Sequence, residues 1–378
     1  MIYSADFWPV IGGVQSVIMT LAQGLAAGDR AREFDCTVVT ETPAGMASDS
    51  RLPFRVVRNP SLIELSRLVW QSDLVHIAGP ALRPLALSFL LRKKVVVEHH
   101  GFQALCPNGL LFHEPTRTSC PGHFLAGLHG ECWKCNAQDG YGRSLKLWAL
   151  TFVRRWSCRF VNANIAPTLW LKQLLELPKT LVISHGVAER PVAPFTGSTS
   201  PKFAFIGRLV STKGLELLLH ASCELWNKRL EFRLLIIGEG SEDQHLRRLC
   251  GQLGVDQKVD FVGHVPEDQV QALLGSAIAI VVPSVAGEVF GLVIVENMMR
   301  GRLAIVPEGG PLAEVAGQAG LKFTAGNAKS LAACMENLLQ SPEVAVQLGD
   351  CARRHSLKNY SAEQMLEGHL SVYQQVLK

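Results

Sequence analysis

Short apolar runs alternate along this chain with longer stretches in which apolar positions recur every three or four residues. The short runs predict buried strands, and the second pattern predicts amphipathic helices. The expected strands of the first half are Cys36–Thr40, Phe54–Val57, Leu74–Ile77, Val95–Glu98, Asn162–Ala166 and Leu181–Ser184. Those of the second half are Phe203–Ile206, Leu234–Ile237, Val259–Val262, Ala279–Val282 and Ala304–Val306. This alternation predicts parallel sheets with right-handed crossovers and ligands at the carboxyl ends of the strands.

A break in composition separates the two halves. Residues 189–201, ERPVAPFTGSTSP, are rich in Pro, Ser, Thr and Gly and read as a linker. The length of 378 residues suits two or three domains with a large buried core. We therefore expect an α/β protein of two Rossmann-like, doubly wound domains, residues 1–190 and 191–361.

One motif in the second half carries the most chemistry. In residues 283–296, PSVAGEVFGLVIVE, the loop residue Glu288 precedes Phe290 and Gly291, a helix begins, and Glu296 follows in its second turn. Backbone N–H groups at a helix start bind anions, and Gly291 allows a close approach. The two carboxylates can accept hydrogen bonds from sugar hydroxyls. Taken alone, the motif is better explained as a capping loop with one solvated Glu.

Three further features lie at strand-to-helix connections. Residues 206–214, IGRLVSTKG, place Gly207, Arg208 and Lys213 ahead of a helix with apolar positions, and the two cations could neutralise a diphosphate. Gly12 and Gly13 precede another helix, and His100 follows the apolar strand in VVVEHHG. Each alone has an ordinary explanation: a solvated basic pair, a tight turn and a structural histidine.

Together these motifs, in this order, resemble the retaining glycosyltransferases of family 4, which have the GT-B fold of two domains facing each other across a cleft. The resemblance covers nearly the whole chain, except that the opening strand, Ile2–Ser4, is short. It implies that Arg208 and Lys213 bind the donor diphosphate, Glu288 the donor sugar and Glu296 the ribose. It also implies phosphate contacts from the amides of residues 290–292, which are Phe290, Gly291 and Leu292, and from Gly12 and Gly13. His100 would contact the transferred sugar, and the helix 362–377 would cross back to the first domain.

Two glycine-containing loops of the second domain are candidates for the nucleobase site. They are residues 238–241, which include Glu239, and residues 263–265, which are Gly263, His264 and Val265. Glycine admits a flat ring and exposes backbone groups that can read its edge. An ordinary turn between strand and helix explains each loop equally well, and the base of the donor, UDP or GDP, stays open.

Charge and composition narrow the function. The formal net charge of +4 is mild and does not call for nucleic acid. No DxD sequence occurs, so we expect charge neutralisation without a catalytic metal. The first ten residues lack a basic region followed by an apolar core, and the run 74–91 is interrupted by His, Pro and Arg. We expect a cytoplasmic protein, with peripheral contact at the inner membrane face.

Four of the ten cysteines fall in one insertion, residues 102–140: Cys106, Cys120, Cys132 and Cys135. A CxxC pair with two further cysteines predicts a structural zinc site. Unpaired thiols, disulfides and an iron–sulfur cluster are the alternatives. The next segment, residues 142–160, is basic and aromatic, which suits either an anionic membrane surface or a helix with one buried face.

The predicted function is retaining transfer of a sugar from a nucleoside-diphosphate sugar to an acceptor hydroxyl, in the synthesis of a cell-surface glycan, glycolipid or related glycoconjugate. The acceptor could be a glycan, a lipid-linked molecule or a small molecule. Two other functions stay open: a nucleotide-sugar epimerase or hydrolase of the same fold, and a zinc-loop binding protein on an inactive scaffold.

Overall fold

The computed structural model describes residues 1–10, 12–43, 49–137, 140–192, 195 and 200–378. The chain divides into two compact units. The first consists of Met1–Leu111, Pro121–Ala188 and Tyr360–Lys378, and the second of Phe112–Cys120 and Glu189–Asn359. The predicted linker, residues 189–201, lies partly outside the described residues.

A seven-stranded sheet in the order β3-β2-β1-β4-β5-β8-β9 forms the centre of the first unit, and all its strand pairs are parallel. Its strands are β1 (Ile2–Ser4), β2 (Thr37–Thr40), β3 (Arg55–Arg58), β4 (Leu74–Ala78), β5 (Lys94–Glu98), β8 (Ala163–Ala166) and β9 (Thr180–Val182). Its helices are α1 (Gly13–Leu25), α2 (Arg30–Glu33), α3 (Leu62–Gln71), α4 (Leu82–Leu90), α5 (His129–Cys135), α6 (Tyr141–Cys158), α7 (Leu169–Leu175) and α15 (Ala362–Leu377).

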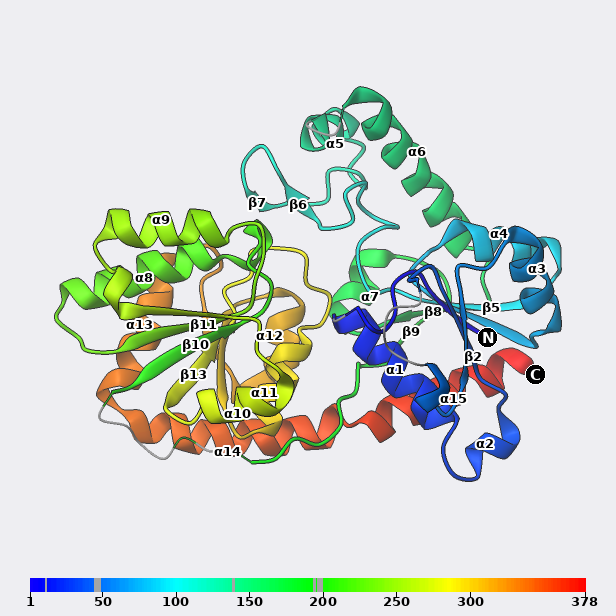
Figure 1. The fold of residues 1–378 in the computed structure, drawn as a ribbon. Helices are drawn as coiled ribbons and strands as arrows, with labels where there is room; N and C mark the ends of the chain where they lie inside the picture. Colours follow the sequence, from blue (N-terminus) through cyan, green and yellow to red (C-terminus); the bar gives the residue numbers. More distant parts are fainter. Residues whose placement is uncertain (11, 44–48, 138–139, 193–194, 196–199) are drawn as a thin grey trace. The chain divides into compact units, whose positions relative to one another are not determined.

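The second unit is built on a six-stranded parallel sheet in the order β12-β11-β10-β13-β14-β15. Its strands are β10 (Lys202–Ile206), β11 (Arg233–Ile237), β12 (Val259–Gly263), β13 (Ala277–Val281), β14 (Leu303–Pro307) and β15 (Leu321–Phe323). Its helices are α8 (Leu215–Asn227), α9 (Asp243–Leu253), α10 (Glu267–Leu273), α11 (Leu292–Met299), α12 (Gly310–Ala316), α13 (Ala328–Gln340) and α14 (Pro342–Asn359). Helices α8 and α9 lie over one face of this sheet and α14 over the other (Figure 1).

The hydrophobic pattern explains this architecture. All residues of β13 and β14 are buried, as expected for parallel strands covered by helices on both faces. In α8 the buried residues recur at near-helical spacing and include Leu215, Leu218, Leu219, Ser222, Leu225 and Trp226. The α/β prediction with two parallel sheets is confirmed.

The order of strands reverses at one place in each sheet. In the first sheet β1 lies between β2 and β4, and in the second sheet β10 lies between β11 and β13. The crossovers on the two sides of such a switch point leave in opposite directions, which opens a crevice at the carboxyl ends of the two central strands. In the second unit, the predicted Arg208 loop follows β10 and the predicted Glu288 loop follows β13.

Every predicted strand is present, with ends that differ by one or two residues. The sequence prediction missed β15, which has only three residues, and the two-residue strands β6 (Phe112–His113) and β7 (Thr118–Ser119). These segments are too short to give an alternating or continuous apolar pattern. The antiparallel pair β6 and β7 groups with the second unit, although the flanking parts of the insertion group with the first.

Helix α15 belongs to the first unit although it follows the second unit in sequence. Ser361 begins it with a capping box, in which its side chain accepts from Gln364 N–H and the Gln364 side chain bonds back. The helix buries one face, including Met365 and Leu366, and lies beside α1. None of the described helices combines the length and the hydropathy that crossing a bilayer requires.

Candidate active site

The loops that follow β10 and β13 contact each other at the switch point of the second sheet. Val285 N–H donates to the Thr212 carbonyl at 2.9 Å. Gly214 has a φ of +68°, and a Cβ there would stand 2.1 Å from the carbonyl oxygen of Pro283. Only glycine allows this approach. The predicted phosphate loop and the predicted sugar loop are therefore held together by backbone contacts.

Lys213 and Glu288 form an ion pair across these two loops. Their side chains are 19% and 16% exposed, and Ser284 Oγ donates to the same Glu288 oxygen at 3.2 Å. This low exposure makes the pair stronger than a surface salt bridge. Arg208 lies on the same loop as Lys213 and is exposed. The arrangement places Lys213 beside a carboxylate, with Arg208 on the same loop, where a parallel sheet binds its ligand.

Helix α11 begins at the end of the Glu288 loop. Gly291 precedes it with a φ of +95°, and no side chain caps its first turn. Ile294 N–H donates to the Gly291 carbonyl at 2.9 Å, and the N–H groups of Leu292 and Val293 ahead of it can face an anion. Phe290, at 2% exposure, is buried beneath this turn. Leu292 is the first residue of the helix, so residues 290–292 lie where the sequence places a phosphate cradle.

Glu296 lies one turn further along α11. Its Oε1 is 3.6 Å from an Arg190 nitrogen, a partner that the sequence did not suggest because Arg190 lies far from Glu296 in the chain, ahead of β10. Burial and the neighbouring Glu267 carboxylate raise the pKa of Glu296, while Arg190 and Arg300 oppose that rise. A ligand that donates hydrogen bonds to Glu296 would stabilise its charged form, which burial and Glu267 disfavour.

The two candidate nucleobase loops also lie at strand ends of this sheet. Gly238 N–H donates to the Gly263 carbonyl at 2.8 Å, and His264 N–H donates to Glu239 Oε1 at 3.2 Å. A Cβ on Gly238 would stand 1.9 Å from the Gly207 carbonyl oxygen, so glycine is required there as well. Val265 follows His264 in this loop. The structure thus joins the loops that follow β10, β11 and β12.

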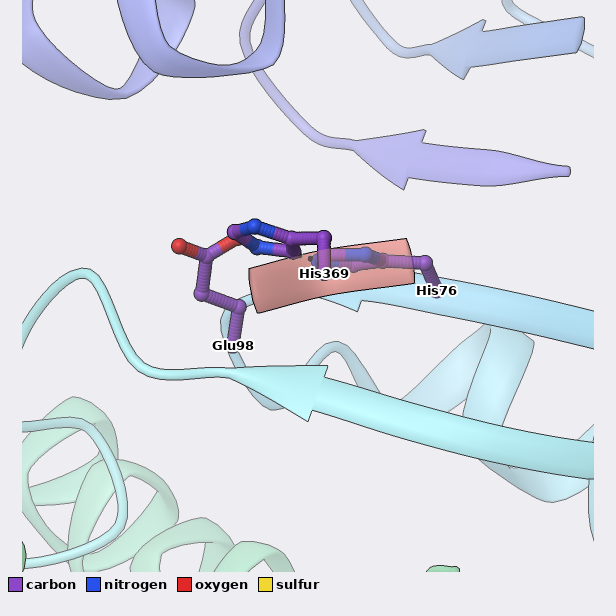
Figure 2. A group of neighbouring side chains, drawn as sticks. All are labelled: His76, Glu98 and His369. Atoms are coloured by element: carbon purple, nitrogen blue, oxygen red, sulfur yellow. Dashed lines mark hydrogen bonds and ion pairs between the residues drawn. The ribbon is translucent and has the colours of Figure 1, made fainter. Parts of the chain in front are cut away.

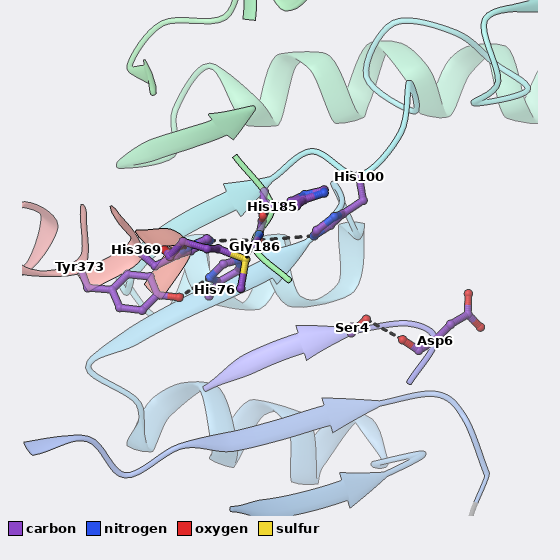
Figure 3. Close-up of polar contacts among 10 residues, drawn as sticks. Ser4, Asp6, His76, His100, His185, Gly186, His369 and Tyr373 are labelled. Carbon is purple, nitrogen blue, oxygen red and sulfur yellow. Dashed lines mark hydrogen bonds and ion pairs between the residues drawn. The ribbon is translucent and has the colours of Figure 1, made fainter. Parts of the chain in front are cut away.

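The first unit carries the remaining predicted residues. Gly12 is the N-cap of α1, Gly13 is its first residue, and neither a side-chain cap nor an acidic residue occupies its first turn. His100 follows β5, and its side chain is 5% exposed. Its Nε2 lies 3.4 Å from Glu98 Oε2, and its ring stacks on that of His185 with centroids 5.0 Å apart. Figure 3 shows this group of side chains.

The adjacent His99 has a different role. Its side chain is fully buried, and its Nε2 lies 3.0 Å from Asn164 Oδ1. Burial lowers the pKa of His99 to about 4, so the imidazole is neutral at neutral pH. His99 is therefore a structural residue of the sheet.

The four cysteines of the insertion are distributed over both units. Cys106, Cys132 and Cys135 are buried in the first, and Cys120 groups with the second. Asn108 links two of them, since Cys106 Sγ lies 2.9 Å from its Oδ1 and its Nδ2 lies 3.3 Å from Cys135 Sγ. In the described residues, the groups of three or more ligand atoms within 4.8 Å of one another contain histidines and carboxylates but no cysteine. The zinc site stays a prediction.

Comparison with known proteins agrees with this geometry. Residues 190–355 match the family model of glycosyl transferases group 1. Over 166 residues the chain is 32% identical to a D-inositol 3-phosphate glycosyltransferase of Corynebacterium efficiens. The matched stretch is 42% of this chain and 39% of that protein. Over 250 residues it is 28% identical to an MMP alpha-(1->4)-mannosyltransferase of Mycolicibacterium hassiacum. This stretch is 61% of this chain and 60% of that protein.

Solved structures extend the likeness to the whole chain. The sucrose-phosphate synthase of Thermosynechococcus elongatus has a TM-score of 0.75 at 18% identity, with 99% of this chain and 98% of that chain covered. HepE of Anabaena, solved in complex with UDP-glucose, has a TM-score of 0.72 at 16% identity, with 99% of each chain covered. At these identities the likeness concerns the fold.

Two parallel sheets with helices, in the arrangement of these structures, define the chain as a GT-B protein. Residues 190–355 match the glycosyl transferases group 1 family, and the family predicted from the sequence is confirmed over this stretch. The chain spans only 28% to 60% of the length of the curated relatives named above and of an uncharacterized glycosyltransferase of Methanocaldococcus jannaschii, which is 40% identical over 111 residues.

Proposed function

We propose that this protein is a retaining glycosyltransferase that moves a sugar from a nucleoside-diphosphate sugar to an acceptor hydroxyl. The observation that carries the proposal is the joined pair of loops at the switch point, with Lys213 on one, Glu288 on the other, and the uncapped start of α11 beside them. It lies within the stretch that matches the family model. The names of the relatives and the UDP-glucose bound to HepE support a donor of this class.

The proposed reaction needs no redox partner. The bond between the anomeric carbon and the diphosphate oxygen breaks, and a bond to the acceptor oxygen forms on the same face of the sugar. The acceptor proton passes to the departing phosphate. Arg208, Lys213 and the first N–H groups of α11 stabilise the charge that grows on the diphosphate, and Glu288 orients the sugar hydroxyls. We propose that catalysis needs no metal, since these groups already supply positive charge.

A donor panel tests this proposal. UDP-, GDP- and ADP-sugars should be screened by thermal shift, because a bound donor raises the apparent stability by mass action. We expect the sugars of one nucleotide, UDP, GDP or ADP, to stabilise the wild-type protein. The Lys228→Ala variant is the control and should be stabilised equally, since Lys228 pairs with Glu336 at an exposed site. The Lys213→Ala variant should show a smaller shift than either of these proteins. If no nucleotide-sugar shifts the wild type, the proposal fails.

The same panel separates the alternative functions. An epimerase or hydrolase would consume the donor without an acceptor, so the products of donor incubated alone are measured by NMR. A sugar-nucleotide that is stable alone and consumed with a mixture of candidate acceptors supports transfer. Salt-dependent binding of nucleic acid without any donor binding would instead favour a zinc-loop binding protein on an inactive scaffold.

We also propose that α6 lies on an anionic membrane surface. Leu145, Phe152 and Trp156 are 52%, 41% and 59% exposed, and they recur at helical spacing among basic residues. Vesicle flotation tests this. We expect binding to vesicles with anionic lipid, weakened in Trp156→Ala and absent with neutral lipid, and equal binding to neutral vesicles would contradict the electrostatic part.

A further inference from the structure

The interior of the first unit contains a carboxylate surrounded by imidazoles. Glu98, the last residue of β5, is fully buried. The Nε2 atoms of His76, His100 and His369 lie 3.1, 3.4 and 3.3 Å from its Oε2, and His185 Nε2 lies 3.4 Å from its Oε1. These residues come from β4, from the segments after β5 and β9, and from α15. An ionised carboxylate at this depth is very unfavourable unless positive charge meets it.

The two histidines without any exposed surface have their outer nitrogens engaged. His76 Nδ1 lies 2.5 Å from the Tyr373 hydroxyl, and His369 Nδ1 lies 2.8 Å from the Met365 carbonyl oxygen. Such partners fix the orientation of an imidazole and leave Nε2 facing inward, as hydrogen-bond partners of the outer nitrogen do for metal-binding histidines. Figure 2 shows the rings of His76 and His369 and the Glu98 carboxylate converging on one place.

The proton positions leave a problem at Nε2. His369 Nδ1 must carry a proton, because a carbonyl oxygen can only accept. In the neutral imidazole, Nε2 then presents a lone pair to the Glu98 oxygen at 3.3 Å, and two acceptors face each other. His76 Nε2, although 3.1 Å from the same oxygen, lacks hydrogen-bond geometry toward it. A proton on His369 Nε2 would make the first contact a hydrogen bond and leave the second unchanged, whereas a metal ion between these three atoms satisfies both.

The spacing suits a metal ion. Zinc binds imidazole nitrogen and carboxylate oxygen at roughly 2.0–2.2 Å in tetrahedral sites, so neighbouring ligand atoms stand about 3.3–3.5 Å apart. The separations of 3.1 and 3.3 Å are close to this edge length, and the three ligand atoms lie within 4.8 Å of one another. We propose that His76 Nε2, His369 Nε2 and the Glu98 carboxylate bind one divalent transition metal, with zinc the first candidate.

A metal bound here would cross-link elements of the first unit. It joins β4 and β5 to α15, and Glu98 and His369 are 271 positions apart in the chain. A link that closes so long a loop stabilises the folded unit. It stands apart from the predicted cysteine site, because its ligands are nitrogen and oxygen. Its three ligands all belong to the first unit, so the proposal does not depend on the donor site of the second unit.

Metal analysis of a cysteine-depleted protein tests the proposal. In a Cys132→Ser/Cys135→Ser background the predicted cysteine site cannot contribute, and we expect about one metal ion per chain by elemental analysis. His76→Gln and His369→Gln in this background should each remove most of that metal. His99→Gln is the matched control, since His99 is an equally buried histidine one residue from Glu98 that bonds to Asn164 instead, and it should retain the metal.

A second measurement does not depend on the folding of variants. X-ray absorption of the metal-loaded wild type should show a nitrogen or oxygen shell at about 2.0–2.1 Å, and a sulfur shell at about 2.3 Å only to the extent that the cysteines also bind. Stripping the cysteine-depleted protein with a strong chelator should lower its melting temperature, and zinc should restore it. The proposal is overturned if this protein holds no metal and zinc does not raise its melting temperature. His369 would then be an imidazolium paired with Glu98.

Discussion

Lys213 is paired with a carboxylate, and a bound diphosphate could take the place of that carboxylate. In the structure it pairs with Glu288, and the two side chains belong to loops that meet at the switch point of the second sheet. A bound diphosphate would attract the ammonium group and free Glu288 to accept hydrogen bonds from the sugar. The ion pair thus keeps both groups in place before the donor arrives.

The first prediction concerns the two cations of this loop. Arg208→Ala and Lys213→Ala should each lower turnover by about 10²-fold, with a smaller loss of donor affinity, because their charge meets charge that grows in the transition state. Steady-state kinetics with the donor identified by thermal shift measures both quantities. Near-normal turnover in Arg208→Ala would remove that residue from the proposed mechanism.

A second prediction concerns the loop that follows β2. Arg58 donates to both oxygens of Asp49, at 2.9 and 2.8 Å, and also to the Trp8 carbonyl at 2.8 Å. These hydrogen bonds lower the pKa of Asp49. We expect Asp49→Asn to reduce the free energy of unfolding of the first unit by about 1 kcal/mol at neutral pH.

The pH dependence of this loss has a defined sign. Because the folded pKa of Asp49 lies below the unfolded value, near 3.9, its contribution is present above the unfolded value and is lost as the pH falls through the folded one. Urea unfolding at neutral pH and well below pH 3.9 measures this. A difference between variant and wild type that persists in acid would show that the mutation acts through something other than this ion pair.

Single residues show where prediction from the sequence stops. The residues that follow β10 and β13 were found because they stand at strand ends next to glycines, a local pattern. Arg190, His76 and His369 were not, because they come from separate elements that only the folded chain brings together. The weak signal available was polarity within apolar strands, such as His76 in LVHIA.

Among the elements, α11 depends on the glycine that precedes its first turn. Gly291 takes a φ of +95°, and a Cβ there would stand 2.6 Å from Leu312 Cδ2. We expect Gly291→Ala to strain the start of α11, to cost roughly 1 kcal/mol or more in stability, and to weaken donor binding. Thermal unfolding with and without the donor measures both effects.

Gly251 provides the control for this substitution. It lies within α9, and a Cβ there meets nothing within 4 Å. Gly251→Ala should therefore stabilise the protein by about 0.5–1 kcal/mol and leave donor binding unchanged. Equal effects of the two substitutions would mean that the backbone at Gly291 has no special role.

At the level of elements, the hydrophobic pattern predicted almost the whole architecture. Strands such as β13 and β14 are continuous apolar runs, and helices such as α8 keep their spacing over several turns. The exceptions are β15 and the hairpin of β6 and β7, whose strands have two or three residues. The pairing of these strands depends on the segments of the same chain that lie beside them, because each strand is too short to show an apolar pattern in its own sequence.

On the scale of the whole molecule, α15 ties the end of the described chain to the first unit. Met365, Leu366, Val372, Tyr373 and Val376 are buried there. We expect a chain that ends at Tyr360 to lose on the order of several kcal/mol from the first unit, at roughly 1.5–3 kcal/mol for each buried large side chain. Limited proteolysis should cut that unit rapidly, while thermal shift by the donor persists in the second unit. Removal of Lys378 alone, which is exposed, is the control. Resistance of the truncated first unit to protease would contradict this.

The return of α15 also sets the order in which the units can fold during synthesis. Residues 1–188 leave the ribosome early but lack the helix that covers part of their core, and this helix is made only after residue 359. The main segment of the second unit, residues 189–359, emerges before it. We therefore expect the usual order, in which the N-terminal domain folds first, to be reversed. Until α15 has been translated, we expect the first unit to be an incomplete domain that chaperones and proteases can reach.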